Sequence, residues 1–170
     1  PMVENGNGMY SDYYSTGILR QKGLYKDGHE EGLWSYYFND GKRMAEGTYC
    51  SGRRCGKWTS WYESGQMKSE LNYESGANTL WYANGQKEME GTLTDGKKQG
   101  KWTFWYEDGK VQRIAGFKDN FRHGQQISFF ADGKQEHEIW FDEGKMHGLA
   151  KWWRADGTTD IEGHFNHEVQ

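Results

Sequence analysis

This 170-residue sequence has no long apolar run, no excess of basic residues and only one proline. No apolar run approaches the roughly 20 residues of a membrane-spanning helix, so we expect no such helix. The 21 basic and 25 acidic residues give a net charge of −4, whereas nucleic-acid binding usually needs a basic patch. We therefore expect no nucleic-acid partner. A signal peptide would show a basic start followed by an apolar stretch, and this sequence has neither. We therefore favour a bacterial-type cytoplasmic protein that starts at Met2.

Cysteine is nearly absent as well. The two cysteines, Cys50 and Cys55, flank the segment Ser-Gly-Arg-Arg, which predicts a turn. Such a pair could form a disulfide across a hairpin loop or half of a metal site. No second cysteine pair and no nearby histidine pair completes a zinc site, so we expect no metal. Two reduced thiols in a loop is the interpretation that we favour.

Aromatic residues and glycine are abundant. Only 34% of the residues are hydrophobic, yet 16% are aromatic, and there are 24 glycines. A low aliphatic content is typical of disordered chains, but those chains are also poor in aromatics. Trp, Tyr and Phe suit a pleated, half-buried surface, and no helical period is visible. Composition therefore favours β-strands.

A repeat organises the whole sequence. In its clearest copy, residues 100–109, an aromatic strand over residues 102–106 runs into an Asp108-Gly109 turn. We expect a two-residue type I′ turn there, with Glu107 opposite Lys110. Equivalent turn glycines recur in steps of 24 residues, with one step of 20, at Gly17, Gly41, Gly65, Gly85, Gly109, Gly133 and Gly157. A fixed period of this kind indicates a repeat architecture.

Each repeat predicts two strands, one before the turn and one after it. The sequence therefore predicts an all-β fold: a single elongated, twisted antiparallel sheet of tandem β-hairpins, with about seven units of 24 residues. Residues 1–8 are polar and rich in Gly and Asn, so we expect a flexible N-terminal lead-in there. One repeat domain is expected over residues 9–170.

Period-two alternation sorts the side chains onto two faces. One face, here called the tryptophan face, holds the first tryptophan of each aromatic phrase, for example Trp34 and Trp102. Trp34 is expected opposite Gly47 and Trp102 opposite Ala115, so that an indole lies over bare backbone. We expect this face, which is the more apolar, to form the core.

The opposite face, here called the glutamate face, carries one large aromatic and often one carboxylate per repeat. Aromatics are enriched among interface anchors, so this face is the candidate surface for a protein partner. The candidate partner-binding residues are Tyr37, Trp61, Trp81, Trp105, Phe129, Trp153, Glu46, Glu70, Glu90 and Glu138. Alternatively, each aromatic merely covers a one-layer sheet that nothing else covers. The continuous row favours binding more strongly than any single member does.

No catalytic arrangement is visible. Neither Ser, His and Asp nor Cys and His are arranged as a nucleophile with its base. His123 and His147 occupy the same place in successive repeats, which indicates loop residues of the repeat rather than metal ligands. No glycine-rich phosphate loop precedes a helix. We expect no enzyme, no catalytic residues and no cofactor.

The unit Gly-Lys-Trp-x-x-Trp-Tyr-x-x-Gly-Lys and the turn segments 95–100 and 143–148 resemble MORN repeats, over roughly residues 9–165. The likeness is nearest to the bacterial variant, whose proteins are often described as antitoxins of toxin–antitoxin systems or as immunity proteins. This resemblance implies a non-enzymatic repeat protein that binds a cognate toxin. The 24-residue period and the shortened repeat after Gly76 are departures from the family pattern.

Three functions compete. A toxin-neutralising protein would use its acidic, aromatic face against a basic toxin, and salt would weaken the complex. A scaffold on membranes or lipids, which MORN proteins elsewhere also suggest, would need a basic patch, so the glutamate row counts against it. A glycan-binding or cell-wall module would suit the aromatic phrases, but such modules work outside the cell. Open sheet edges also allow copies to pair, so the oligomeric state stays open.

Overall fold

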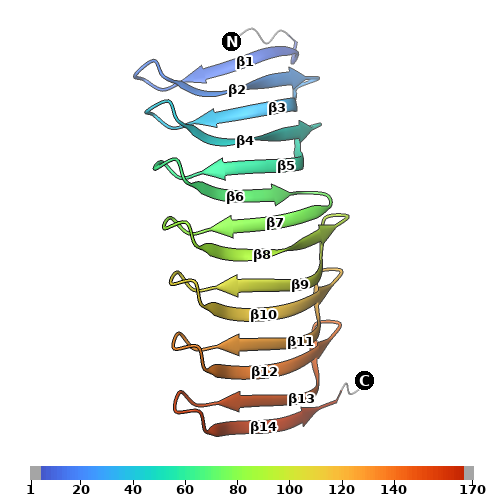
Figure 1. Ribbon diagram of the computed structural model, residues 1–170. Coiled ribbons are helices and arrows are strands. Elements are labelled where there is room, and N and C mark those ends of the chain that lie inside the picture. Colours follow the sequence, from blue (N-terminus) through green and yellow to red (C-terminus); the bar gives the residue numbers. More distant parts are fainter. Residues whose placement is uncertain (1–4, 167–170) are drawn as a thin grey trace. The chain divides into compact units, whose positions relative to one another are not determined.

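The computed structural model describes residues 5–166. All the regular secondary structure in that part of the chain consists of β-strands. Fourteen strands follow one another in chain order in an antiparallel sheet (Figure 1). The predicted all-β sheet of tandem hairpins is confirmed. The first four residues of the expected lead-in and the last four of the expected repeat domain lie outside the described residues.

The chain divides after Gly76 into two compact units, close to where one repeat lacks four residues. The first unit contains β1 (Gly8–Tyr13), β2 (Leu19–Lys26), β3 (His29–Tyr37), β4 (Arg43–Cys50), β5 (Arg53–Trp61) and β6 (Met67–Asn72). The second contains β7 (Gly76–Trp81, from its second residue), β8 (Lys87–Thr94), β9 (Lys97–Trp105), β10 (Val111–Lys118), β11 (Phe121–Phe129), β12 (Gln135–Asp142), β13 (Lys145–Trp153) and β14 (Thr159–Phe165).

The turn inside each hairpin has three residues, so the predicted two-residue turn was wrong. Tyr106 N donates to Lys110 O at 2.8 Å and Gly109 N to Tyr106 O at 2.9 Å, which leaves Glu107, Asp108 and Gly109 in the turn. Gly109 has a φ of 85°, whereas Asp108 keeps a negative φ. The Asp108 carboxylate accepts the Lys110 N–H at 3.0 Å, and this contact favours a type I turn followed by a glycine.

Type I′ geometry occurs instead at the turns between hairpins. Both residues of such a turn have positive φ, for example 50° at Ser51 and 77° at Gly52. The equivalent pairs are Asp27-Gly28, Ser51-Gly52, Asp95-Gly96, Asp119-Asn120 and Glu143-Gly144. The flanking residues pair directly, as Cys50 does with Arg53. The positive φ that a type I′ turn needs at both central residues therefore occurs at the turn between hairpins, not at the turn inside each hairpin.

A bulge cancels the extra turn residue. Trp105 pairs with Val111, the ladder then skips one residue of β10, and Phe104 pairs with Arg113. From there Trp102 opposes Ala115, as predicted, and in the first unit Trp34 opposes Gly47. The turn takes one extra residue from the first strand of the hairpin, and the bulge takes one extra residue from the second strand. The two cancel in the register, so the predicted assignment of side chains to the two faces holds.

The tryptophan face is the more buried face. Its three innermost indoles, 2–3% exposed, belong to Trp34, Trp58 and Trp102. Each lies over a glycine of the preceding strand, where an added Cβ would fall 2.0–2.2 Å from the indole; these glycines are Gly23, Gly47 and Gly91. We expected each indole to lie over the glycine or alanine on the second strand of its own hairpin, and that prediction was wrong. Each tryptophan instead completes the core of the hairpin before it.

Side chains at the three-residue turns connect successive hairpins. The hydroxyls of Tyr14, Tyr82 and Tyr106 each donate to a backbone carbonyl 23 residues further along, at 2.7–2.8 Å. Lys110 Nζ donates to Ala131 O at 2.8 Å in the same direction. These bonds fix the spacing between hairpins on the side of the turns, as the indoles do in the core.

Candidate functional site

The register brings the predicted acids into rows on the glutamate face. In the first unit, a row across β2 to β6 consists of Lys22, Ser35, Glu46, Thr59 and Glu70. In the second unit, a row across β8 to β14 consists of Glu90, Thr103, Ile114, Ile127, Glu138, Lys151 and Glu162. Within each unit the candidate glutamates therefore share one line across the strands.

These glutamates have partners of their own. Glu46 accepts a hydrogen bond from Ser35 Oγ at 3.2 Å and lies 3.4 Å from Arg43. Glu70 pairs with Lys57 and Glu90 with Lys87. Glu138 accepts hydrogen bonds from two glutamine side chains, Gln125 at 2.5 Å and Gln135 at 3.2 Å. Because basic residues neutralise three of the four acids, this face is less negative than the glutamates alone imply.

The candidate aromatics end the first strand of each hairpin and are half-buried. Tyr37, Trp61, Trp81, Trp105, Phe129 and Trp153 all share this position. Lys87 Nζ lies 5.7 Å from the Trp105 ring centroid, and Lys151 Nζ lies 5.5 Å from that of Trp153, both within cation–π range. Each ring is thus partly covered and partly accessible, so binding a partner and covering the sheet both stay open as roles for these residues.

Exposed aliphatic residues on the same face were missed by the sequence analysis. In the first unit Met9 and Leu33 are 60% and 61% exposed, and Leu24, which pairs with Met9, is 38% exposed. Leu33 shares the face of Ser35, two residues further along β3. We call these three residues the Met9 patch. Equivalent positions elsewhere hold Thr48 and Lys57, so an apolar residue at a polar repeat position was the available signal.

Exposed apolar residues also lie on the glutamate face of the second unit, among them Trp140 and Leu149. Trp140 is 44% exposed and Leu149 is 47% exposed. Trp140 pairs with Gln125 and Leu149 with His164, which places both at the type I′ end of their strands. Large apolar side chains that gather on one face, rather than scatter, are typical of interaction surfaces.

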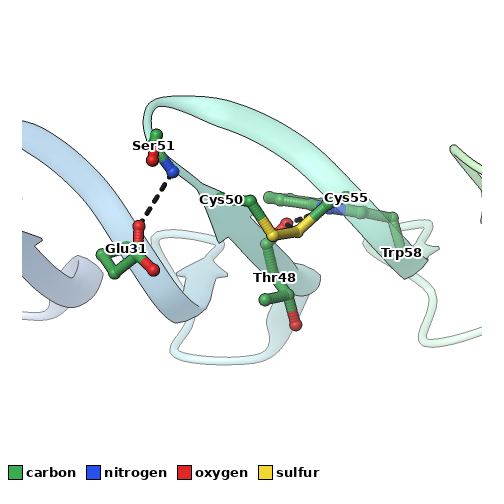
Figure 2. The surroundings of a disulfide bond; sticks show 6 residues. All are labelled: Glu31, Thr48, Cys50, Ser51, Cys55 and Trp58. Atoms are coloured by element: carbon green, nitrogen blue, oxygen red, sulfur yellow. Dashed lines mark hydrogen bonds between the residues drawn. A yellow bond between two sulfur atoms is a disulfide. The ribbon is translucent and has the colours of Figure 1, made fainter.

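The two cysteines form a disulfide, so the prediction of two reduced thiols was wrong (Figure 2). Cys55 pairs with Thr48 and Cys50 with Arg53, which brings the two cysteine Cα atoms to 5.9 Å, within the range of a disulfide. The bond spans a type I′ turn whose Ser51 N–H donates to the Glu31 carboxylate at 2.8 Å (Figure 2). It therefore closes a turn that is also attached to the preceding hairpin.

A histidine lies beside an aspartate near the type I′ turns of the second unit. His123 Nδ1 lies 3.1 Å from Asp142, beside a cleft of about 400 Å³ between neighbouring turns. Within residues 5–166, no three His, Cys, Asp or Glu side chains are grouped so that they could hold a metal ion. The same residues contain no helix long and apolar enough to cross a membrane.

The fold and these surfaces define a tandem-hairpin repeat protein of the kind that binds through its repeats. A family model described as a MORN repeat variant matches residues 6–27, 30–51, 54–75 and 98–119, which together exceed half of the chain. Each match covers one hairpin, such as β1–β2 or β9–β10. The chain belongs to the MORN repeat variant family. No curated protein matches it.

Proposed function

We propose that this protein is a non-enzymatic binding module that holds a partner protein against its glutamate face. In its specific form the proposal is that the partner is a cognate toxin, which the module neutralises as an antitoxin or immunity protein. The Met9 patch is the observation that carries the choice of face, because its three aliphatic side chains are exposed on the same face as the half-buried aromatic row. Family membership supports a repeat-based binding role.

A protein partner fits this surface better than a membrane does. Anionic lipid headgroups attract clusters of basic side chains, whereas Arg43, Lys57 and Lys87 next to the glutamate rows are already paired with carboxylates. Aliphatic and aromatic groups with internally paired charges resemble the central part of a protein interface. The lipid scaffold is therefore the second candidate, and co-sedimentation with anionic liposomes tests it.

The decisive experiment compares two triple variants in affinity capture from the source organism. Met9, Leu24 and Leu33 are changed to serine in one, and Met146, Ile161 and Phe165 in the other. The control residues are also exposed and apolar but lie on the tryptophan face. We expect one protein that is toxic when expressed alone, lost by the first variant and kept by the control. A partner lost only by the control overturns the choice of face, and a non-toxic partner overturns toxin neutralisation.

The disulfide gives the cytoplasmic location a specific test. Disulfides persist mainly in oxidising compartments and are rare in the cytosol. Alkylation of free thiols in denatured protein taken directly from cells, followed by mass measurement, counts the reduced cysteines. Two alkylated thiols support the cytoplasm, whereas an intact Cys50–Cys55 bond places the protein in an oxidising compartment.

A further inference from the structure

Successive hairpins match one another in side-chain size on the tryptophan face. At each junction, one residue of a hairpin's second strand faces one residue of the next hairpin's first strand. The facing pairs within the two units are Gly23 with Trp34, Gly47 with Trp58, Gly91 with Trp102, Ala115 with Gln126 and Ile139 with Ala150. In these pairs, glycine occurs only where the next strand supplies an indole to cover it.

Gly163 on β14 stands at the same repeat position, 24 residues after Ile139, but has no such cover. No strand lies beyond β14 among residues 5–166. Within its own hairpin, Gly163 pairs with Ala150, which is also small. An added Cβ would meet only the Phe165 ring, at 3.6 Å, whereas the covered glycines have an indole atom at 2.0–2.2 Å. The match in size therefore predicts a large aromatic side chain from a further strand.

The surroundings of Gly163 suit an aromatic ring. Phe165 stands where Tyr25 and Tyr49 stand in earlier hairpins. Those two tyrosines pack edge-on against the tryptophan of the following strand, with ring centroids 5.2 and 5.0 Å apart. Phe165 is 38% exposed, and Ile161 on the same face of β14 is 57% exposed. We call the space over Gly163, between these two apolar side chains, the Gly163 slot.

The backbone of β14 can take a further strand as well. In the described part of the chain, β13 pairs with one edge of β14 and no strand pairs with the other. An open edge presents unpaired N–H and C=O groups to which an extended segment readily adds. The occupant that fits is thus a strand with a large aromatic residue opposite Gly163.

The first strand of the sheet carries such a residue. Tyr10 on β1 stands at the tryptophan position, 24 residues before Trp34, and it pairs with Gly23 as Trp34 pairs with Gly47. The described residues contain no strand before β1, so its outer edge is open too. The edge of β1 therefore offers the aromatic side chain that the edge of β14 lacks.

The neighbouring position fits equally well. When β1 is placed on β14 in the register of the junctions inside the chain, Ser11 lies opposite Glu162. Two junctions inside the chain already combine a hydroxyl with a carboxylate at this place. They are the pairs of Thr59 with Glu46 and of Thr103 with Glu90.

We propose that β1 of a second copy of this chain docks on the open edge of β14, with Tyr10 of that copy in the Gly163 slot. The two surfaces differ, so the contact is head to tail, and every dimer keeps one open edge of each kind for further copies. The proposal does not rest on the role of the glutamate face.

Sedimentation velocity of the 170-residue protein tests this association in a concentration series that reaches about 200 µM, because small interfaces are typically weak. We expect the mean mass to rise with concentration. Gly163→Ala should weaken association about tenfold, since the new Cβ overpacks the slot. Tyr10→Ser should weaken it as much, whereas Tyr13→Ser, at a 57% exposed tyrosine on the other face of β1, should leave it unchanged.

Mixing the two weakened variants is the decisive step. Each keeps the edge that the other has lost, so an equimolar mixture should form a 1:1 dimer although neither variant associates alone. Near-ultraviolet circular dichroism checks that each variant is folded. If Tyr10→Ser is not, Tyr10→Trp decides, because the indole of the other junctions should tighten association.

Three results would overturn the proposal. The first is an unmodified protein that stays monomeric throughout the series. The second is association that Gly163→Ala abolishes but Tyr10→Ser leaves intact, since two β14 strands would then pair with each other. The third is a mixture of the two variants that stays monomeric.

Discussion

At the scale of single residues, the contact between Gly47 and Trp58 gives the sharpest stability prediction. A Cβ on Gly47 would lie 2.2 Å from the Trp58 indole, which is 3% exposed and cannot move away. We expect Gly47→Ala to lower the free energy of unfolding by about 1–3 kcal/mol, as overpacking does. Gly163 is the matched control: it stands at the same repeat position, but an added Cβ would meet only Phe165, at 3.6 Å. Urea unfolding of both variants checks this, and equal losses would contradict it.

A second prediction concerns the tyrosine hydroxyls that connect hairpins. Tyr106 Oη donates to Phe129 O at 2.7 Å. Tyr106→Phe removes this bond without changing the ring, so we expect a loss of about 1 kcal/mol in the free energy of unfolding. The repeat already contains phenylalanine at this position, as Phe38 and Phe130, so the change should not alter the fold. A loss no larger than that of an exposed control, Tyr13→Phe, would show that the hydroxyl contributes nothing.

These residue contacts mark what the sequence could and could not reveal. Alternation and turn spacing predicted that Trp34 pairs with Gly47, and it does. They could not predict which glycine the indole covers, because a large side chain reaches sideways onto a neighbouring strand while register describes only the backbone. The burial of Gln126, which is 5% exposed, was missed for a related reason: a polar residue on a strand shows no sign of burial until its neighbours are placed.

At the scale of the hairpin, the aspartates of the three-residue turns predict a response to acid. Backbone and side-chain hydrogen bonds with Lys110 lower the pKa of Asp108, and the same kind of contact with Lys134 lowers that of Asp132. A carboxyl whose pKa is lower in the folded state stabilises the fold above the unfolded pKa of about 3.9, and this contribution is lost as pH falls through the folded pKa. We therefore expect stability to decline below about pH 4.

Thermal unfolding between pH 2 and 7 measures that decline. Asp108→Asn combined with Asp132→Asn keeps an oxygen that can accept the turn N–H but removes the titration, so the slope below pH 4 should become shallower. Ser64→Asn, at the equivalent turn position, removes no carboxylate and is the control, so it should leave the slope unchanged. An unchanged slope in the double variant would place the acid sensitivity elsewhere.

The turns also show why local signals need their context. Asp-Gly is compatible with both a type I′ turn and a type I turn followed by glycine, and the two differ by one residue in register. Asp108 accepts the N–H two residues ahead and keeps a negative φ, whereas Asp95 has a φ of 50°. The dipeptide is the same in both places. The flanking strands, with their bulges, decide which turn forms.

At the scale of the whole molecule, the disulfide should stabilise the first unit alone. Loop-closure entropy for a ring of this size predicts about 2 kcal/mol. Reduction, or Cys50→Ser with Cys55→Ser, should therefore speed amide hydrogen exchange in β4 and β5 but leave β11 and β12 unchanged. Equal acceleration in both units would mean that they unfold as one.

The salt dependence of partner binding is the prediction on which sequence and structure differ most. The sequence showed a row of carboxylates, which predicts an affinity that falls steeply with salt. It could not show that Arg43, Lys57 and Lys87 neutralise three of them, because which long side chains meet depends on the register. Paired charges on one surface create little long-range field, and salt hardly screens the apolar contact that we propose for the exposed Met9 patch.

We therefore expect the dissociation constant for a captured partner to change less than about threefold between 50 and 300 mM NaCl, since the charges that salt would screen are already paired. Lys57→Met, which leaves Glu70 without its lysine, should make the dependence steeper if the partner is basic, and Lys26→Met, a lysine on the same face away from the row, serves as the control. Surface plasmon resonance across the salt series measures both. A tenfold loss of affinity in the unmodified protein would mean that the glutamates attract the partner despite their pairing.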